Sequence, residues 1–410
     1  MLEIIFSSIV LIAEAKGIIS PPMVTFISES IKRAEEENAE VLILELDTPG
    51  GLSESMKEIV KSIMGSKVPV CVYVYPAGAG AASAGVFILL SAHIAAMAEG
   101  TNVGAAHPVM LGDTASKTMR EKIVNDAVAY IRSIAEKRKR NADWAEKAVR
   151  KSVSITANEA LKLKVIDIIA NSEEKLLKKL NKYKVEIDGK EKVIHTENAI
   201  IKRIKRSIIH RILSLLANPT IAYILLLIGM YGIIFELQNP GAIFPGVVGA
   251  IALILAFYSF QMLPVNFAGL MLIIIAIIMF ILEVKVTSYG MLTVGGIISF
   301  VLGSIFLFQT NTPFFKLSLP VIVIATGLTV IFFLIVIGFT IKAHKRKPVS
   351  GAEGLIGLEG VAKTELAPKG TVFVRGEWWN AESEGEVIKK GEEIIVTKVK
   401  GLRLVVKKKK

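Results

Sequence analysis

The second half of the chain carries apolar runs that restrict its fold more than any other feature. Five stretches are nearly free of charged residues, and each is close to the roughly 20 residues that cross a bilayer as a helix. Hydrophobic residues make up 52% of the 410-residue chain, a share too high for an ordinary soluble protein. We therefore predict a multi-pass integral membrane domain of about five helices over residues 219–342, embedded in the lipid bilayer. The expected helices cover 221–237, 242–263, 267–282, 289–308 and 319–341, the third being the shortest.

Basic clusters lie close to the apolar segments. They occur at 202–206, 344–348 and 407–410, and the net charge is +12. This pattern suits anionic lipid headgroups better than a nucleic-acid groove, so we predict no nucleic-acid partner. Over residues 199–218, isoleucines and leucines recur among Lys and Arg, which favours an amphipathic helix at the membrane surface over a soluble amphipathic helix.

The first 198 residues alternate short β-rich runs with amphipathic helical ones. Met23, Ile27 and Ile31 recur at helical spacing, and the following run "VLILEL" has the pattern of a strand buried on both faces. Such alternation predicts an α/β domain with a parallel sheet. The first residues, "MLEIIFSSIVLIA", lack a basic amino-terminal region and a cleavage site, so they fit a signal segment poorly and can instead form the first strand.

The last segment, 350–410, returns to strand signals separated by glycines. About five short strands in some 55 residues predict a small all-β barrel of the OB type. Trp378 and Trp379, near Arg375, fit two alternatives. They either form a stacking platform of the kind that binds oligonucleotides, or divide into one core and one surface residue, and the second alternative is favoured.

Two glycine-rich turns carry the pattern that points to chemistry. "LELDTPGGL" ends a buried strand at Gly50 and Gly51, where backbone N–H groups can face a ligand without a side chain in the way. "YPAGAGAASAGVF" places Ser83 at an expected helix start, where its own N–H and that of Ala84 lie near the positive end of the helix dipole. Taken alone, each motif is more typical of tight packing or of a helix-capping serine than of a catalytic site.

A serine hydroxyl needs a base nearby to act as a nucleophile. Two candidates follow Ser83: His107 in "GAAHPV" and Lys122 at the head of an amphipathic helix. A lysine can accept a proton at neutral pH only if it is shielded from bulk water. Without a partner motif, Lys122 would be an ordinary solvated lysine on a helix face.

Four ordered motifs resemble those of one family. "DTPGG", "AASAG", the helix "MREKIVNDAVAYIRSIAEKRKRN" and "SITANEALKLKVIDIIA" occur in the order and spacing of the NfeD-type membrane serine proteases, whose catalytic domain has the ClpP/crotonase fold. The apolar block and the "GEWWNA" segment resemble the long form of the same family. The resemblance implies three parts: a ClpP-like serine protease domain over 1–198, a helical transmembrane domain, and a small OB-like barrel.

The resemblance also implies roles for individual residues. Ser83 corresponds to the nucleophile and Lys122 to the general base of a Ser-Lys dyad, while the N–H groups of Gly51 and Ala84 line the oxyanion hole. The implied partner is a stomatin-like membrane protein, whose hydrophobic segment is the peptide substrate, and a homo-oligomer is expected.

His107 competes with Lys122 for the role of base, because it falls near the position of the histidine in soluble ClpP proteases. The acid that would orient it is missing, since the matching position is Ser152 rather than an aspartate. We therefore favour Lys122 and expect His107 to line the substrate cleft.

Metal and nucleotide chemistry have no support in the sequence. The five histidines are scattered and show no metal-binding spacing, and there is no Walker loop. We predict that the enzyme needs no metal or other cofactor and is independent of ATP.

The charge flanking the apolar block gives an orientation. Five spans would place the two soluble domains on opposite sides, and the basic segment 344–348 favours a cytoplasmic barrel and an extracytoplasmic protease domain. The basic residues at 202–211 favour the reverse, although an interfacial helix could account for them.

Three functions compete on these grounds. The first is a membrane-bound serine endopeptidase that cleaves hydrophobic segments of membrane proteins. The second is a catalytically idle scaffold that organises stomatin-like proteins. The third, a crotonase-like acyl-CoA enzyme, fits least, because such an enzyme needs neither a serine nucleophile nor membrane spans.

Overall fold

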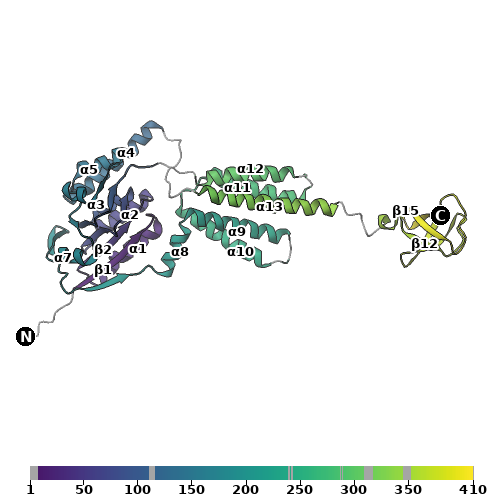
Figure 1. Ribbon diagram of the computed structural model, residues 1–410, viewed down its shortest axis with the longest axis horizontal. Coiled ribbons are helices and arrows are strands. Elements are labelled where there is room, and N and C mark those ends of the chain that lie inside the picture. Colours follow the sequence, from purple (N-terminus) through teal and green to yellow (C-terminus); the bar gives the residue numbers. More distant parts are fainter. Residues whose placement is uncertain are drawn as a thin grey trace, which may run out of the picture. The chain divides into compact units, whose positions relative to one another are not determined.

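The computed structural model describes residues 8–109, 116–238, 241, 243–286, 288, 290–308, 317–344 and 352–409. It divides into two compact units at residues 327 and 328, and each is described by itself. The predicted fold class is confirmed: an α/β domain comes first, apolar helices follow, and a closed barrel ends the chain (Figure 1).

The α/β domain is built on a six-stranded sheet with the strand order β11-β1-β2-β3-β5-β8, in which every pair is parallel. A second, three-stranded sheet has the order β4-β6-β7, and β9 pairs with β10. The strands are β1 Ile9–Lys16, β2 Val41–Asp47, β3 Val70–Val74, β4 Gly80–Ala82, β5 Ile94–Met97, β6 Asn102–Gly104, β7 Ser154–Thr156, β8 Ile168–Ile169, β9 Lys184–Ile187, β10 Lys190–Val193 and β11 Ile200–Ile204.

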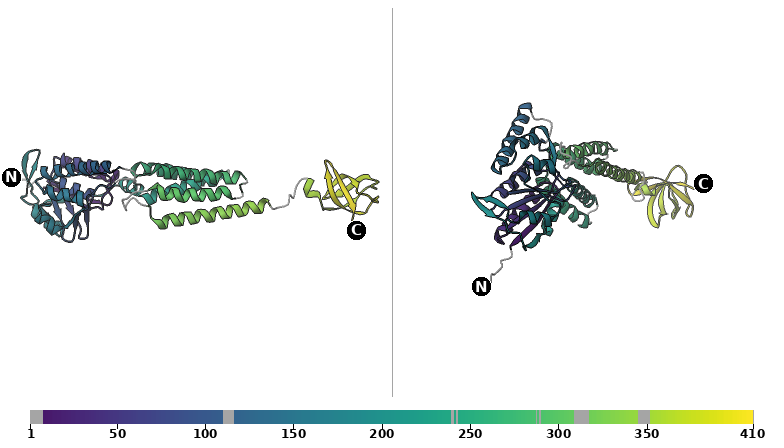
Figure 2. Two further views of the ribbon diagram at one scale, coloured as in Figure 1. Left: turned by 90° about the horizontal axis from the view of Figure 1, so that it is seen from above. Right: turned by 60° about the vertical axis from the view of Figure 1, so that its left-hand side comes forward.

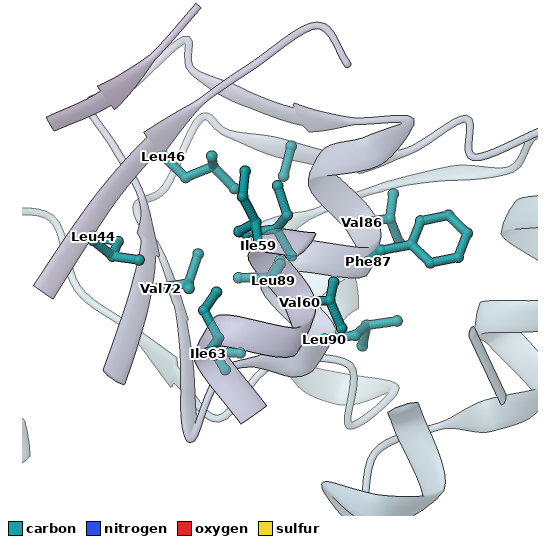
Figure 3. Close-up of a cluster of buried hydrophobic side chains, with 14 of the residues drawn as sticks. Leu44, Leu46, Ile59, Val60, Ile63, Val72, Val86, Phe87, Leu89 and Leu90 are labelled. Atoms are coloured by element: carbon teal, nitrogen blue, oxygen red, sulfur yellow. The ribbon is translucent and has the colours of Figure 1, made fainter. Parts of the chain in front are cut away.

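Helices cover both faces of the six-stranded sheet. They are α1 Pro21–Glu36, α2 Ser53–Met64, α3 Ala84–Ser91, α4 Lys117–Lys137, α5 Ala142–Lys151, α6 Ala157–Lys162 and α7 Glu173–Leu180. Residues of β2 alternate between two cores as predicted: Leu44 and Leu46 pack with α1, α2 and α3, whereas Ile43 packs with α7. Figure 3 shows Leu44 and Leu46 on one side of Ile59 of α2. The ring of Phe87, from α3, lies on the side away from Leu44 and Leu46.

The predictions for the first strand and for segment 199–218 have different outcomes. Residues 9–16 form β1, as one alternative expected, and residues 1–7 lie outside the described part. The single helix expected over 199–218 is wrong, because Ile200–Ile204 is strand β11 and only Ile208–Leu216 is helical, as α8. β-branched Ile200 and Ile201 pair with β1, which offers a parallel edge that outweighs their amphipathic helical spacing.

Five apolar helices follow α8, as predicted. They are α9 Pro219–Gln238, α10 Ile243–Met262, α11 Phe267–Lys285, α12 Met291–Leu307 and α13 Leu319–His344. Within the described residues, α9 and α10 are long and apolar enough to cross a membrane, and the other three contain shorter apolar stretches. The basic segment 344–348, on which the orientation depends, lies outside the described residues after His344.

The apolar helices pack as two close pairs, α9 with α10 and α11 with α12 (Figure 1). Glycines permit the close approach, since a Cβ at Gly269 would lie 2.5 Å from the backbone nitrogen of Leu307. At the end of α11, Glu283 Oε1 and Oε2 accept the N–H groups of Gly290 and Thr293, at 3.0 and 2.9 Å, and so cap α12.

The carboxyl-terminal barrel closes five strands in the order β12-β13-β14-β16-β15 (Figure 2). Its elements are the short 3-10 helix Ala352–Leu355 and β12 Glu359–Ala362, β13 Lys369–Val374, β14 Glu377–Ser383, β15 Glu393–Lys400 and β16 Arg403–Lys408. Trp379 packs against the barrel core, and Trp378 is 65% exposed. The favoured alternative of one core and one surface tryptophan is therefore confirmed. The two side chains differ in burial because successive residues of a strand face opposite sides of the sheet.

A glycine substitution tests the α11–α12 packing. Gly269→Ala places a methyl group against the backbone of Leu307 and should destabilise the pair by about 1–3 kcal/mol. We expect a lower midpoint of thermal unfolding in detergent. Gly327→Ala is the matched control, because a Cβ at Gly327 meets no atom within 4 Å. Equal midpoints for the two variants would contradict the packing.

A buried carboxyl in the α/β domain makes stability depend on pH. Glu45 Oε2 lies 3.6 Å from Arg203 Nη1, and its Oε1 has no hydrogen-bond partner. Burial raises the pKa of Glu45 to about 7; the Glu173 carboxylate adds to the shift and Arg203 opposes it. The folded state thus binds this proton more tightly than the unfolded state. Its stabilising contribution is complete below the ordinary value of 4.5 and is lost as pH rises to about 7.

The substitution Glu45→Gln removes this titration while keeping the side-chain shape. We expect the midpoint of thermal unfolding of the wild type to fall between about pH 5 and about pH 7, and the variant to show a smaller fall. Glu58→Gln, on the exposed face of α2, is the control and should follow the wild type. If the midpoints of wild type and Glu45→Gln fell equally with pH, Glu45 would not be the group responsible for the pH dependence.

Candidate active site

The two glycine-rich turns meet because they follow neighbouring strands. β2 and β3 are adjacent and parallel, so their carboxyl ends lie at the same edge of the sheet. Thr48, just after β2, donates its N–H to the carbonyl of Gly80 at 2.8 Å and accepts the N–H of Ala82 at 3.0 Å. Asp47 Oδ1 accepts the Gly80 N–H at 3.1 Å and so helps to hold the second turn against the end of β2.

Gly50 and Ser83 are in direct contact. A Cβ on Gly50 would lie 2.8 Å from the Cβ and 3.2 Å from the Oγ of Ser83, and the φ angle of Gly50 is +119°. Both the space and the backbone angle therefore require glycine at this position. The first turn lies against the serine itself.

Ser83 joins β4 to α3 with an unusual backbone. Its φ and ψ angles are 51° and −110°, a conformation that non-glycine residues rarely adopt. Strained serines between a strand and a helix are typical of nucleophiles that must be held exposed. Its own N–H donates to the carbonyl of Gly104 at 3.0 Å, so this group is not available for an oxyanion, contrary to expectation.

Two other N–H groups are available. Within the described residues, the amides of Gly51 and Ala84 have no hydrogen-bond acceptor. Ala84 is the first residue of α3, whose leading N–H groups have no partner inside the helix. Gly51 cannot carry a side chain, since a Cβ there would lie 2.1 Å from the carbonyl oxygen of Ile19. The resemblance implied these two N–H groups as the donors of an oxyanion hole, and that role stays a prediction.

A cavity of about 350 Å³ opens beside these groups. Its walls come from α2, α3, α4 and the two turns, and most lining side chains are apolar. No group of three or more His, Cys, Asp or Glu in the described part of the chain could hold a metal ion. The lining residues are Gly51, Leu52, Ser53, Met56, Lys57, Ser83, Ala84, Phe87, Ala106, Pro108, Val109, Ile123, Asp126, Ala127 and Tyr130.

One wall of the cavity contains polar side chains that the sequence did not reveal. The Phe87 ring stacks on Tyr130 with 6.0 Å between centroids, and Lys57 Nζ lies 5.6 Å from the centroid of Tyr130. The same ammonium lies 3.3 Å from Asp126 Oδ2. From the sequence, Lys57 resembles an ordinary surface lysine. The one feature that could have pointed to a place at the site is its position on the first helix after the "DTPGG" turn.

Lys122 lies next to the cavity-lining residue Ile123, but it is exposed and is not itself part of the lining. The expected shielding from water is therefore not provided by the described residues. The reason is local: α4 has no buried residue before Val128, so its first turns project from the core. Residues 110–115, just before this helix, lie outside the described part.

His107 differs from the prediction that it lines the cleft. It is exposed and is not among the described lining residues. Its Nδ1 lies 2.8 Å from the carbonyl oxygen of Val149, so a backbone group orients the ring instead of a carboxylate. Ser152, at the position of the missing acid, ends α5 in a left-handed conformation.

Family models match all three parts of the chain. The NfeD1b N-terminal domain matches residues 10–190, the NfeD integral membrane domain matches 220–339, and the NfeD-like C-terminal, partner-binding domain matches 352–408. The matches follow the order of the α/β domain, the apolar helices and the barrel.

Known proteins resemble the chain over nearly its full length. Membrane-bound protease PH1510 from Pyrococcus horikoshii is 39% identical over 415 residues, covering 98% of this chain and 94% of the relative. Membrane protein NfeD1b from Bacillus subtilis is 29% identical over 94% of this chain and 89% of its own length. A solved structure of the 1510-N membrane-bound stomatin-specific protease, a lysine-to-alanine mutant with a substrate peptide, is 39% identical. It covers 51% of this chain and 97% of its own, with a TM-score of 0.48. The prediction of a membrane-bound protease is confirmed.

The first turn gives a test of the site. Gly51→Ala forces the turn away from Ile19 and moves its N–H donor, so kcat/KM for peptide cleavage should fall about 10²- to 10³-fold, as for loss of one oxyanion donor. Gly65→Ala is the control. Gly65 follows α2 with an ordinary negative φ, and a Cβ at this position would lie 3.3 Å from the nearest atom. Equal activity of the two variants would exclude Gly51 from the oxyanion hole.

Proposed function

The chain belongs to the NfeD family, and we propose that it is an ATP-independent serine endopeptidase whose centre is a Ser83–Lys122 dyad. The observation that carries the proposal is the contact between the two glycine turns. At the edge of an apolar cavity, that contact brings a strained serine close to two N–H groups that have no acceptor among the described residues. The proposed nucleophile, the proposed oxyanion donors and the apolar cavity are thus close to one another, which supports acyl transfer.

Acylation follows from this arrangement. Lys122, in its neutral form, takes the proton as Ser83 Oγ attacks the peptide carbonyl carbon. The carbonyl oxygen becomes an oxyanion and accepts hydrogen bonds from the N–H groups of Gly51 and Ala84. The tetrahedral intermediate collapses, the C–N bond breaks, and the leaving amine takes the proton from the lysine. Water then attacks the acyl-serine ester through the same steps and releases the carboxylic acid.

Lys122 must be shielded for this role, and an apolar substrate is a suitable shield. A peptide segment lying over Ile123 and the cavity would exclude water from the first turns of α4. A second copy of the chain would cover the same surface further, which agrees with the expected homo-oligomer. His107, with Nδ1 directed at Val149, is the weaker candidate for the base.

The substrate that fits is a hydrophobic peptide segment. A cavity of about 350 Å³ lined by Met56, Phe87, Ile123 and Tyr130 accepts side chains such as Leu or Val. The solved relative is described as stomatin-specific and the last domain as partner-binding. We extend both to this chain and propose a stomatin-like membrane protein as partner and substrate.

The proposed membrane arrangement has five spans, α9 to α13, with the protease domain outside and the barrel in the cytoplasm. Helix α8 is the proposed interfacial segment. Its Ile208, Ile209, Ile212 and Leu215 are exposed, whereas His210 is buried against Phe26 of α1 at 5.8 Å between ring centroids. An apolar face directed away from the protein suits lipid better than water.

The second candidate function is a catalytically idle scaffold that organises stomatin-like proteins. The exposure of Lys122 favours this alternative, because the described residues do not shield this side chain from water as a lysine base requires. Partner binding through the barrel would then be the whole function.

Peptide cleavage by the full chain in detergent separates the two. With peptides rich in Leu, Ile and Val, we expect Ser83→Ala to lower kcat by about 1000-fold or more, and Lys122→Ala to do the same. His107→Ala should retain activity near that of the wild type.

Three outcomes would change the assignment. Cleavage by Ser83→Ala at the wild-type rate would leave the scaffold as the function. An active Lys122→Ala with an inactive His107→Ala would move the base to the histidine. Added ATP that raises the rate would overturn ATP independence.

A further inference from the structure

The amino-terminal half of α4 is held in an unusual way. Every buried residue of this helix lies at Val128 or later, and residues 117–127 are exposed or half-buried. This part of the helix nevertheless carries Lys122 and forms one wall of the cavity. Its core contacts are those of the partly buried Val124 and Ala127, so polar contacts at its surface also help to fix its position.

Two of the described polar contacts of this half-helix reach neighbouring helices, α2 and α5. Asp126 Oδ2 lies 3.3 Å from Lys57 Nζ of α2, and Asn125 Oδ1 accepts from Arg150 Nη1 of α5 at 2.9 Å. Asp126 is four residues after Lys122, so the two side chains lie one turn apart on the same side of the helix. A shift of Asp126 would move Lys122 with it.

Lys57 also connects this half of α4 to the nucleophile. Its ammonium lies over the ring of Tyr130, which stacks on Phe87, and Phe87 is four residues after Ser83. The contacts run from Ser83 along α3 to Phe87, across the cavity wall to Tyr130 and Lys57, and then to Asp126. Both ends of the proposed dyad are thus attached to one set of side chains.

We infer that Lys57 is a positioning residue of the peptidase: it binds Asp126 and Tyr130 and thereby fixes the half-helix that presents Lys122 to Ser83. The inference rests on the proposed dyad. Lys57 itself does not transfer the proton, because its ammonium is engaged by a carboxylate and a ring.

The pair contributes little to global stability. The side chains of Lys57 and Asp126 are 49% and 72% exposed, and ion pairs this exposed add little to the free energy of unfolding. Loss of the pair should therefore change kcat with almost no change in the midpoint of thermal unfolding. That combination distinguishes positioning from a structural role.

The test compares two substitutions of Lys57. Lys57→Met keeps the apolar stem but loses the ion pair, and we expect kcat for an apolar peptide to fall about tenfold, because small misplacements of a catalytic group have such effects. Lys57→Arg keeps the charge and the reach, so it should recover most of the loss. Arg cannot act as a base, so Lys122→Arg should stay inactive. Lys61→Met, one turn later on α2 and exposed, is the matched control.

A second measurement does not need activity. Hydrogen exchange of residues 117–127 should be faster in Lys57→Met and in Asp126→Asn than in the wild type. The double variant should exchange at the same rate as the single variants, because each substitution removes the same ion pair. Residues 142–151 should be unchanged. Unaltered exchange in Lys57→Met, or a Lys57→Arg as inactive as Lys57→Met, would overturn the inference. An active Ser83→Ala would instead overturn the proposed function and leave the exchange result to decide the role of Lys57.

Discussion

The contact of Gly50 with Ser83 is the constraint on which the rest of the site depends. With 2.8 Å between the position of a Cβ on Gly50 and the Cβ of Ser83, the two turns have no room for another side chain. The same approach places the next amide, that of Gly51, on the side of the cavity. Parallel pairing of β2 with β3 brings the turns together, and helix α3 begins where the serine needs an adjacent positive dipole end. Removal of any of these three features would separate Ser83 from the proposed oxyanion donors.

The site has a rigid half and a half held by surface contacts. Ser83, Gly51 and Ala84 are placed by backbone geometry beside a packed core, whereas Lys122 is on a half-helix that has no fully buried residue and is held partly by polar side chains. Under the proposed function, a preference for apolar segments would have two sources, the lining of the cavity and the need to keep water from Lys122.

Much of this architecture could be predicted from the sequence, for reasons that differ between elements. The strand "VLILEL" is buried on both faces, so its composition alone indicates a central position. Ser83 and Gly51 were singled out because their motifs resemble those of one family in order and spacing, and their catalytic roles stay predictions. Segment 199–218 was misjudged because Ile200 and Ile201 suit both an amphipathic helix and an edge strand, and only β1 decides between them. The exposure of Lys122, the orientation of His107 and the contacts of Lys57 all depend on packing between distant elements, which no local pattern encodes.

Strand β11 has a consequence for how this protein can be divided. Ile200–Ile204 follows the rest of the α/β domain in the chain, yet it pairs with β1 and completes the sheet just before α8. A soluble fragment cut at residue 198 would leave the N–H and C=O groups of β1 unpaired along a hydrophobic edge. Such edges recruit strands from other molecules, so the fragment would tend to aggregate. The boundary between the soluble domain and the membrane segment therefore lies after Ile204, and the chain enters α8 directly from the sheet.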